Sequence, residues 1–327
     1  MVRSRAPGKL VLLGEYAVLD GAPALVVAVN RYCKAKIVAA KPPCRLTTQM
    51  VGVEQFSFAP GESSGVALVD LVRRSWPQPS GWSASLDSSE FFAQGSKLGL
   101  GSSAAALVAW AGAWEAYRHP GGFKPDLTAL IELHRVFQNG AGSGLDVAAA
   151  LIGGVVSYRL DAAGMPHIGS VRLPNSVAFA GVFAGQSAAT PGLINRYRSW
   201  AEERPGVAAE LKQTMGKVAE LGLAALREDD VKAFSSALRD YGRCLDDLGR
   251  AMGAEVWTAE HRAIEAEADR CGLVYKVSGA GGGDTGVAFA RDPEALALFA
   301  STISARGYLV VELNVDQQGL VVEERSQ

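Results

Sequence analysis

The sequence predicts a protein of mixed α and β structure, built from two packed domains. Its 327 residues are too many for one small domain and suit two domains of ordinary size. Strand patterns dominate the N-terminal part, and helical patterns interrupted by a few strands fill the remainder. Because a chain of this length buries most of its apolar surface, it needs neither disulfide bonds nor a structural metal to fold.

The N-terminal part reads mainly as strands and turns. An Asp20-Gly21 turn signal separates the first two apolar runs. Apolar residues at helical spacing predict one helix in this part, at residues 65–76. Strands are predicted at residues 9–13, 22–30, 32–40, 45–48 and 82–86.

The central part is predicted to be mainly helical. Segment 102–118 is rich in alanine and lacks proline, which favours a long helix. A proline followed by an aspartate suits the first turn of a second helix, at 125–138. A short apolar helix at 145–152 and a strand at 155–160 complete this part.

Residues 161–175 are the expected domain junction, because they are rich in glycine, proline and short polar residues. The domains would then span residues 1–170 and 171–327. Strands are predicted in the second domain at 176–184, 273–277, 286–290 and 308–315. Helices are predicted there at 206–227, 229–252, 258–271 and 293–306.

Charge and composition exclude several classes of function. The formal net charge is −2 and no block of like charges occurs, so we expect neither nucleic-acid nor membrane-surface binding. The four cysteines form no CxxC pair and are expected to be reduced thiols. The first apolar run is too short for a signal peptide, and no run is long enough to span a membrane. We therefore expect a soluble cytoplasmic protein.

The segment GSKLGLGSSAAA at residues 95–106 is the most informative one. Gly99 and Gly101 allow a tight turn and a close approach to a ligand. The helix that follows offers unpaired amides and a positive dipole end, which suit the phosphates of ATP. A hydroxyl of Ser102 or Ser103 would also reach a magnesium ion. The other interpretation is a turn with a serine at the N-cap of the helix.

Two further glycine-rich segments stand apart from this loop. The run KVSGAGGGDTG at 276–286 is either a flexible hairpin or a loop that approaches a phosphate group or the first glycine loop. The run AGSGLDVAAA at 141–150 places Asp146 just inside a helix, with Ser143 as a possible N-cap. Taken alone, Asp146 is an ordinary first-turn residue, and Lys9 is an ordinary lysine at the end of a strand.

Three segments together change this interpretation. APGKLVLLGEYAVLDG, KLGLGSSAAAL and KVSGAGGGDTG occur in this order along nearly the whole chain. They resemble the three motifs of the GHMP kinases, a family named for galactokinase, homoserine kinase, mevalonate kinase and phosphomevalonate kinase. Within the family, the details resemble the phosphomevalonate kinases most.

Three details support that resemblance. Lys97 precedes the Gly-Leu-Gly turn, where mevalonate kinases usually lack a lysine. The run from His134 to Asp146 resembles the corresponding phosphomevalonate kinase run, and Arg135 stands where mevalonate kinases have a glutamate that helps bind magnesium. Segment 185–191, with Arg198 behind it, looks like the part that faces the substrate. Thr285 departs from the pattern, since many relatives have a cysteine there.

The resemblance implies a two-domain α+β fold with the active site in the cleft between the domains. It also implies transfer of a phosphoryl group from ATP, with Mg²⁺, to the phosphate of phosphomevalonate. Three alternatives remain: a kinase acting on an alcohol such as mevalonate, a diphosphomevalonate decarboxylase, or a binding protein that has lost catalysis. The only expected partner is a small phosphorylated acid, and the protein would be a monomer or a homodimer.

The resemblance also assigns roles to individual residues. Lys9 and Asp146 are expected to be catalytic. The expected ATP-binding residues are Lys97, Gly99, Leu100, Gly101, Ser102, Ser103 and Ala104, with Ser102 and Ser103 also near the metal. The expected substrate-binding residues are Ser143, Gly144, Ser187, Thr190, Arg198, Gly279, Ala280, Gly281, Gly282 and Asp284. Arg196 and Arg198 cannot both face one ligand, because they lie two residues apart at helical spacing. The resemblance to the family favours Arg198.

Overall fold

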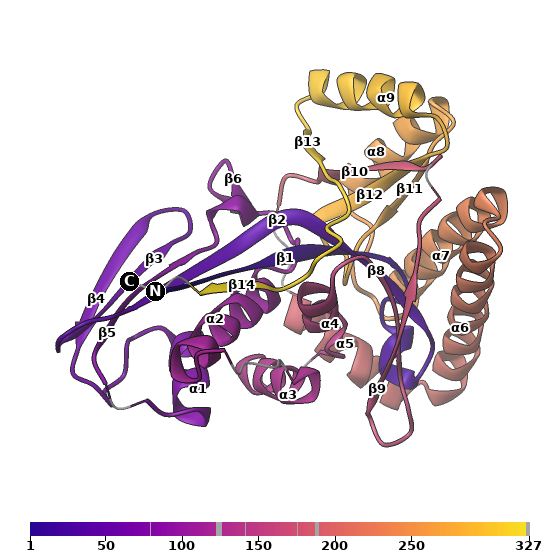
Figure 1. Ribbon diagram of the computed structural model, residues 1–327. Helices are drawn as coiled ribbons and strands as arrows, with labels where there is room; N and C mark the ends of the chain where they lie inside the picture. Colours follow the sequence, from indigo (N-terminus) through magenta and orange to yellow (C-terminus); the bar gives the residue numbers. More distant parts are fainter. Residues whose placement is uncertain (79, 122–125, 141, 175, 187–189, 325–327) are drawn as a thin grey trace.

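The computed structural model describes the whole chain except residues 79, 122–125, 141, 175, 187–189 and 325–327. The described strands form an eight-stranded sheet, a four-stranded sheet and a two-stranded hairpin of β6 (Phe92–Ala93) and β7 (Ser96–Lys97). Figure 1 shows the large sheet lying above a group of helices, with the small sheet beyond its far end. The fold is α+β, as predicted.

The large sheet is built around two long strands, β1 (Val2–Leu13) and β2 (Ala24–Ala39). Its main path runs β14-β1-β2-β5-β3-β4, and β8 and β9 extend it beside β2. All neighbouring strands in it are antiparallel except β3 and β5, which run parallel. The other strands are β3 (Cys44–Gln49), β4 (Val53–Phe58), β5 (Trp82–Asp87), β8 (Val155–Leu160), β9 (Pro166–Val171) and β14 (Val321–Glu324).

Helices cover one face of this sheet (Figure 1). They are α1 (Ala67–Ser75), α2 (Ser102–Arg118), α3 (Leu127–Phe137) and α4 (Leu145–Ile152). Helix α2 is the central one and packs on both β1 and β2. All of its alanines are buried, and such small side chains let a helix approach a sheet closely. The stacked rings of Trp110 and Trp114 then fill the space beside Trp82 of β5.

The small sheet is antiparallel throughout, in the order β11-β12-β10-β13. Its central strand β12 (Thr285–Ala290) is buried at every position, because both faces are covered. The other strands are β10 (Ala178–Phe183), β11 (Val274–Val277) and β13 (Leu309–Glu312). The accompanying helices are α5 (Thr190–Glu203), α6 (Pro205–Arg227), α7 (Val231–Ala251), α8 (Ala259–Arg270) and α9 (Pro293–Ala305).

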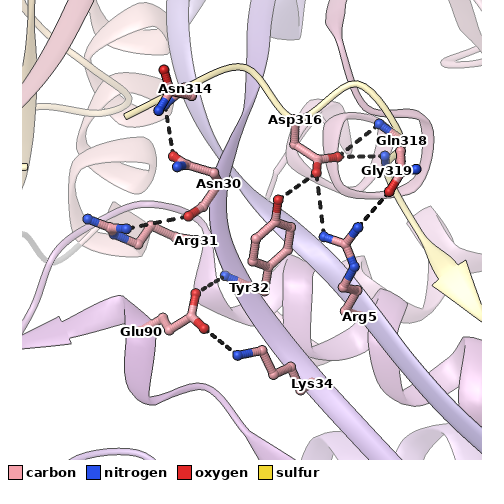
Figure 2. A network of polar contacts seen from close by, with 10 residues as sticks. All are labelled: Arg5, Asn30, Arg31, Tyr32, Lys34, Glu90, Asn314, Asp316, Gln318 and Gly319. Carbon is pink, nitrogen blue, oxygen red and sulfur yellow. Dashed lines mark hydrogen bonds and ion pairs between the residues drawn. The ribbon is translucent and has the colours of Figure 1, made fainter. Parts of the chain in front are cut away.

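The end of the chain returns to the first sheet, and a polar network holds it there. Figure 2 shows Asp316 accepting hydrogen bonds from the Tyr32 hydroxyl, at 2.7 Å, and from the amide of Gly319, also at 2.7 Å. Arg5 lies 3.7 Å from Asp316 and stacks on the ring of Tyr32. Strand β14 then pairs with β1. The large sheet therefore includes a strand from beyond residue 170, and the domain limits at 1–170 and 171–327 stay a prediction.

The structure corrects several of the predicted elements. The predicted strands at 22–30 and 32–40 are one strand, β2, with a register shift of its partner at Pro7 and Gly8. The predicted junction at 161–175 contains β9, which pairs with β8. The long final strand shrinks to β13. Helix α5 and the short strands β4 and β14 have no counterpart in the prediction. Within the described residues, no helix is both long and apolar enough to cross a membrane.

Candidate active site

Lys9 lies directly across the glycine loop that precedes α2. Its backbone amide donates a hydrogen bond to the Leu100 carbonyl at 2.8 Å, and its Nζ lies 3.4 Å from the Gly99 carbonyl. Gly101 has φ +80°, and a Cβ there would sit 2.9 Å from Lys9 Cγ. Position 101 therefore requires glycine for two reasons. Its backbone is in the left-handed conformation, and the side chain of Lys9 occupies the space that a Cβ would need. The first and second motifs thus form one surface.

The third glycine-rich segment packs against the same loop. The Thr285 hydroxyl donates to the Leu98 carbonyl at 2.7 Å, so the residue that departs from the family pattern ties the two loops together. A Cβ on Gly99 would lie 2.4 Å from the Cβ of Asp284. A Cβ on Gly279 would lie 3.8 Å from Lys9 Nζ. Of the two interpretations of residues 276–286, the structure supports the close approach to the first loop.

Helix α2 presents the site with an open N-terminus. Its N-cap is Gly101 in the left-handed region, and no side chain caps the helix. The serine N-cap interpretation is therefore wrong. The first amides of α2 have no intrahelical acceptors, and together with the helix dipole they favour an anion. Leu100 and Ala104 are fully buried, so they contribute backbone and packing to this site, whereas Lys97 is exposed.

Buried His134 of α3 lies between α2 and α4. Its Nε2 is 3.2 Å from the Ser103 hydroxyl, and its Nδ1 is 3.7 Å from the Asp146 carboxylate. Asp146 stands in the first turn of α4, as predicted, but the N-cap of that helix is Gly144 at φ 91° and not Ser143. His134 therefore connects the predicted phosphate-binding serine to the predicted catalytic aspartate, although the sequence analysis assigned it no role.

A cavity of about 130 Å³ opens where these elements meet. Among its lining residues are five from the predicted site: Lys9, Ser143, Asp146, Gly279 and Ala280. Gly281 and Gly282 lie at the back of the loop instead, where a Cβ would meet Val256 or Leu193. Ser187 lies outside the described residues, and so does the side chain of Thr190, the first residue of α5. Arg198 lines a second, larger cavity that shares Leu19 and Gly142 with the first.

The electrostatics of the cavity centre on Lys9. Burial lowers the pKa of Lys9 below its ordinary value. The carboxylates of Asp146, Asp284 and Glu15 oppose this shift and favour the charged amine, while Lys97 adds to the lowering. A lysine held in this way gains from the arrival of further negative charge, such as phosphate oxygens.

The sequence did not predict a buried ion pair at the wall of the cavity. Glu15 pairs with Lys276, and both side chains are almost completely buried. Burial raises the pKa of the Glu15 carboxyl, and the positive charge of Lys276 counteracts that rise. Glu15 also lies 3.4 Å from the amide of Gly279. The available signal was a charged residue close to an apolar strand pattern in each of two motif segments, Glu15 after residues 10–13 and Lys276 between Tyr275 and Val277.

His261 is a second missed residue, behind the third loop. Its Nε2 donates to the Gly283 carbonyl at 2.9 Å, and its Nδ1 accepts from the Tyr275 hydroxyl at 2.7 Å. This pattern needs the neutral imidazole, and burial lowers the pKa of His261 accordingly. Tyr16 supports the same loop, because its hydroxyl donates to the Ala280 carbonyl at 2.6 Å.

The site offers oxygen ligands for a cation, but the protein side chains alone do not provide a complete coordination shell. Among the described residues, no group of three or more histidine, cysteine or acidic side chains is arranged to hold a metal ion. Mg²⁺ commonly needs only one or two protein oxygens besides phosphates and water. The Ser103 hydroxyl and the Asp146 carboxylate are two separate oxygen ligands of this kind, because they contact opposite ring nitrogens of His134.

Comparison with known proteins finds one family model that matches part of the chain. Residues 223–309 match the family model described as GHMP kinases C terminal. The phosphomevalonate kinase of Saccharolobus solfataricus is 27% identical over 99% of each chain. The mevalonate kinase of Thermococcus sibiricus is 26% identical over 99% of this chain and 98% of its own. The resemblance to the GHMP kinases, inferred from three short motifs, is confirmed.

Solved structures show the same fold. The Lin0012 protein of Listeria innocua superimposes with a TM-score of 0.85 at 22% identity, covering 99% of both chains. The phosphomevalonate kinase of Streptococcus pneumoniae, solved with phosphomevalonate and AMPPNP, has a TM-score of 0.80 at 19% identity. That comparison covers 96% of this chain and 100% of the other.

Proposed function

From a chain with a GHMP kinase C-terminal domain and full-length similarity to kinases of that family, we propose an ATP-dependent phosphomevalonate kinase. The reaction would transfer the γ-phosphoryl group of ATP to the phosphate of phosphomevalonate and release diphosphomevalonate and ADP. One observation carries the proposal. A lysine and a carboxylate, Lys9 and Asp146, line one cavity, and the same lysine lies against the glycine loop that leads into the uncapped N-terminus of α2.

The N-terminus of α2 is the proposed phosphate-binding element. The amides of Ser102, Ser103 and Ala104 would donate to phosphate oxygens, and the helix dipole adds a favourable field. Gly99 and Gly101 leave room for the side chains of Asp284 and Lys9 to pack directly against this loop. Bound Mg²⁺ would neutralise phosphate charge, and Ser102 and Ser103 are the residues proposed to lie beside it.

Lys9 is the proposed catalytic cation. Two polyanions must approach each other in this reaction, so local positive charge lowers the barrier. Lys9 Nζ sits above the Gly99 carbonyl, where the loops of all three motifs meet. The carboxylate of Asp146 favours the charged form of the amine. We propose that Asp146 keeps Lys9 protonated and oriented while the acceptor phosphate, already nucleophilic near neutral pH, attacks without a general base.

The second candidate is a mevalonate kinase. Relatives of similar identity carry this name, including the Thermococcus sibiricus protein. A primary alcohol acceptor would need a proton acceptor, and Asp146 in the cavity could take that role. Arg135 argues for the phosphorylated acceptor, because it places a cation near the cavity where the alcohol kinases of the family have a glutamate. The expected cytoplasmic location and the oligomeric state stay predictions.

An acceptor panel tests the proposed function. Purified protein is incubated with ATP, Mg²⁺ and one of three acids, mevalonate, phosphomevalonate or diphosphomevalonate, and the release of ADP and of carbon dioxide is measured. We expect turnover with phosphomevalonate and little with mevalonate. The reverse preference would replace the proposal by an alcohol kinase. Release of carbon dioxide from diphosphomevalonate would indicate a decarboxylase, and ATP binding without turnover of any acid would indicate a binding protein.

A further inference from the structure

The imidazole ring of His134 joins the first turns of two helices. His134 lies in the last turn of α3, which packs against both α2 and α4. Its side chain is almost completely buried, with Nε2 3.2 Å from the Ser103 hydroxyl and Nδ1 3.7 Å from the Asp146 carboxylate. Phe137 stacks beside it, with ring centroids 6.4 Å apart. One ring nitrogen therefore faces α2 and the other faces α4.

The chemistry of the two neighbours selects one tautomer of this ring. A neutral imidazole carries hydrogen on one nitrogen and accepts at the other. The Asp146 carboxylate can only accept, so it favours hydrogen on Nδ1. Nε2 is then the acceptor, and the Ser103 hydroxyl is the donor in their contact. The polar contacts thus run in one direction, from Ser103 through His134 to Asp146.

This direction fixes how the Ser103 hydroxyl faces the phosphate-binding end of α2. A serine hydroxyl has one hydrogen and two lone pairs. With the hydrogen directed at His134, the lone pairs are left for a cation, and Mg²⁺ binds to oxygen lone pairs. Ser103 is half-buried, whereas Ser102 beside it is buried. Ser103 therefore offers an oriented oxygen at the start of α2.

The other end of this series of contacts is the Asp146 carboxylate. Asp146 also accepts a hydrogen bond from the amide of Val147 at 3.0 Å, within its own helix. Its negative charge favours the protonated form of Lys9. A single buried ring thus contacts both the serine that faces the cation and the carboxylate that acts on the lysine.

We infer that His134 is a positioning residue, which acts through Ser103 on the binding of ATP with Mg²⁺ and through Asp146 on turnover. This inference rests on the proposed function for its kinase chemistry. The tautomer of His134 is a property of the free protein and does not depend on that function. Groups that hold the residues around a metal in this way commonly set both its affinity and the activity.

The first experiment measures the tautomer of His134 in the unligated protein. The chain has four histidines, of which His119 and His167 are exposed. A variant with glutamine at these two positions keeps His134 and His261 for ¹⁵N NMR, and a further His261→Gln substitution identifies the signals of His134. We expect hydrogen on Nδ1 of His134, opposite to the arrangement in His261. Hydrogen on Nε2, or on both nitrogens, would overturn the inference.

Two substitutions separate the contacts of His134. In His134→Gln the amide reaches the position of Nε2 and accepts from Ser103, but the contact with Asp146 is lost. In His134→Asn the amide reaches only the position of Nδ1, so the contact with Ser103 is lost. Calorimetry with and without Mg²⁺ gives the gain in ATP affinity that the metal provides. We expect His134→Asn to reduce this gain about tenfold, and His134→Gln to keep it but lower kcat about tenfold.

Ser103→Ala provides the matched control. In this background the partner of Nε2 is absent, so His134→Asn should cause no further loss of the gain in ATP affinity due to Mg²⁺. If the two losses add in full, His134 does not act through Ser103. If His134→Asn and His134→Gln change both quantities equally, or change neither, the ring only fills space between the helices. Each of these results would overturn the inference.

The results also separate this inference from the proposed function. If the acceptor panel shows no turnover of phosphomevalonate, the proposed function fails, but the tautomer and the calorimetry are unaffected. The effect on kcat is then measured with the acid that the wild type does turn over. If no acid is turned over, the tautomer and the gain in ATP affinity decide. A wild type whose ATP affinity does not increase with Mg²⁺ would overturn the inference.

Discussion

At the scale of single residues, the charge state of Lys9 is the first quantity to measure. Because burial lowers the pKa of Lys9, the free enzyme should lose this cation as pH rises, at a pH below the ordinary lysine value of 10.5. We predict that kcat/KM for ATP decreases at high pH, because this parameter reports the protonation state of the free enzyme. Lys9→Arg should keep weak activity and lose this decrease, because a guanidinium group stays charged. If the fall of kcat/KM at high pH persists unchanged in Lys9→Arg, a group other than Lys9 causes it.

Asp146 provides the second prediction at this scale. Asp146→Asn keeps the shape of the side chain but removes the negative charge that favours protonated Lys9. We predict unchanged folding and ATP affinity, measured by calorimetry, with turnover lower by orders of magnitude. If turnover stays within about threefold of the wild type, which corresponds to under roughly 1 kcal/mol, Asp146 is only a first-turn residue of α4.

The sequence predicted these two residues because each belongs to a short motif. It could not predict what lies between them. Contacts of His134 with Ser103 and Asp146 depend on how three helices pack, and no local pattern encodes that arrangement. The pair of Glu15 and Lys276 joins positions 261 residues apart. Both residues were visible as charges next to apolar strand patterns, but only the fold shows that they meet.

At the scale of elements, regular local patterns were predicted well. The limits of α2 and α4 agree with the predicted helices, because alanine-rich segments end at glycine or at the His119-Pro120 pair. The long strand β2 was divided in two, since its polar residues from Asn30 to Tyr32 interrupt the apolar run. The short edge strand β14 was missed, because only its pairing with β1 makes it a strand.

The contact between the second and third glycine loops gives a prediction with a close control. In Gly99→Ala the new methyl group would overlap Asp284, so the loops must separate and the phosphate site must deform. We predict a loss of ATP affinity of about tenfold or more, equivalent to roughly 1.4 kcal/mol. Gly95→Ala is the control: Gly95 has φ +76°, almost the same as Gly99 at +75°, but open space around it. Equal effects of the two substitutions would mean that backbone strain alone is responsible.

His261, which holds the third glycine-rich loop, should make the stability of the protein depend on pH. Burial lowers the pKa of His261 below its ordinary value of 6.5, so the unfolded chain takes up the proton first as pH falls. The stabilising effect of the neutral ring is complete above that value and is lost as pH falls towards the lowered pKa. We predict that the free energy of unfolding decreases below pH 6.5 more steeply in the wild type than in His261→Gln. Parallel pH profiles from denaturant titrations would contradict this prediction.

At the scale of the whole molecule, the site depends on segments from both ends of the chain. Motif one lies in the large sheet and motif three borders the small sheet, and Glu15 and Lys276 join them under the cavity floor. The hydroxyl of Tyr241 in α7 also donates to the Glu15 carbonyl at 2.7 Å. Buried charges in this position couple the stability of the two sheets to the geometry around Lys9.

This coupling leads to the last prediction. Removing one member of a buried ion pair leaves the other uncompensated, at a cost of about 3–5 kcal/mol, whereas replacing both by apolar residues is often nearly neutral. Glu15→Leu and Lys276→Met should therefore each lower the free energy of unfolding by several kcal/mol, about 3 or more. The double variant should lose much less than the sum of the two, as measured by denaturant unfolding. If the two effects simply add, the residues act independently, and the connection between the sheets must be carried by the apolar contacts around them.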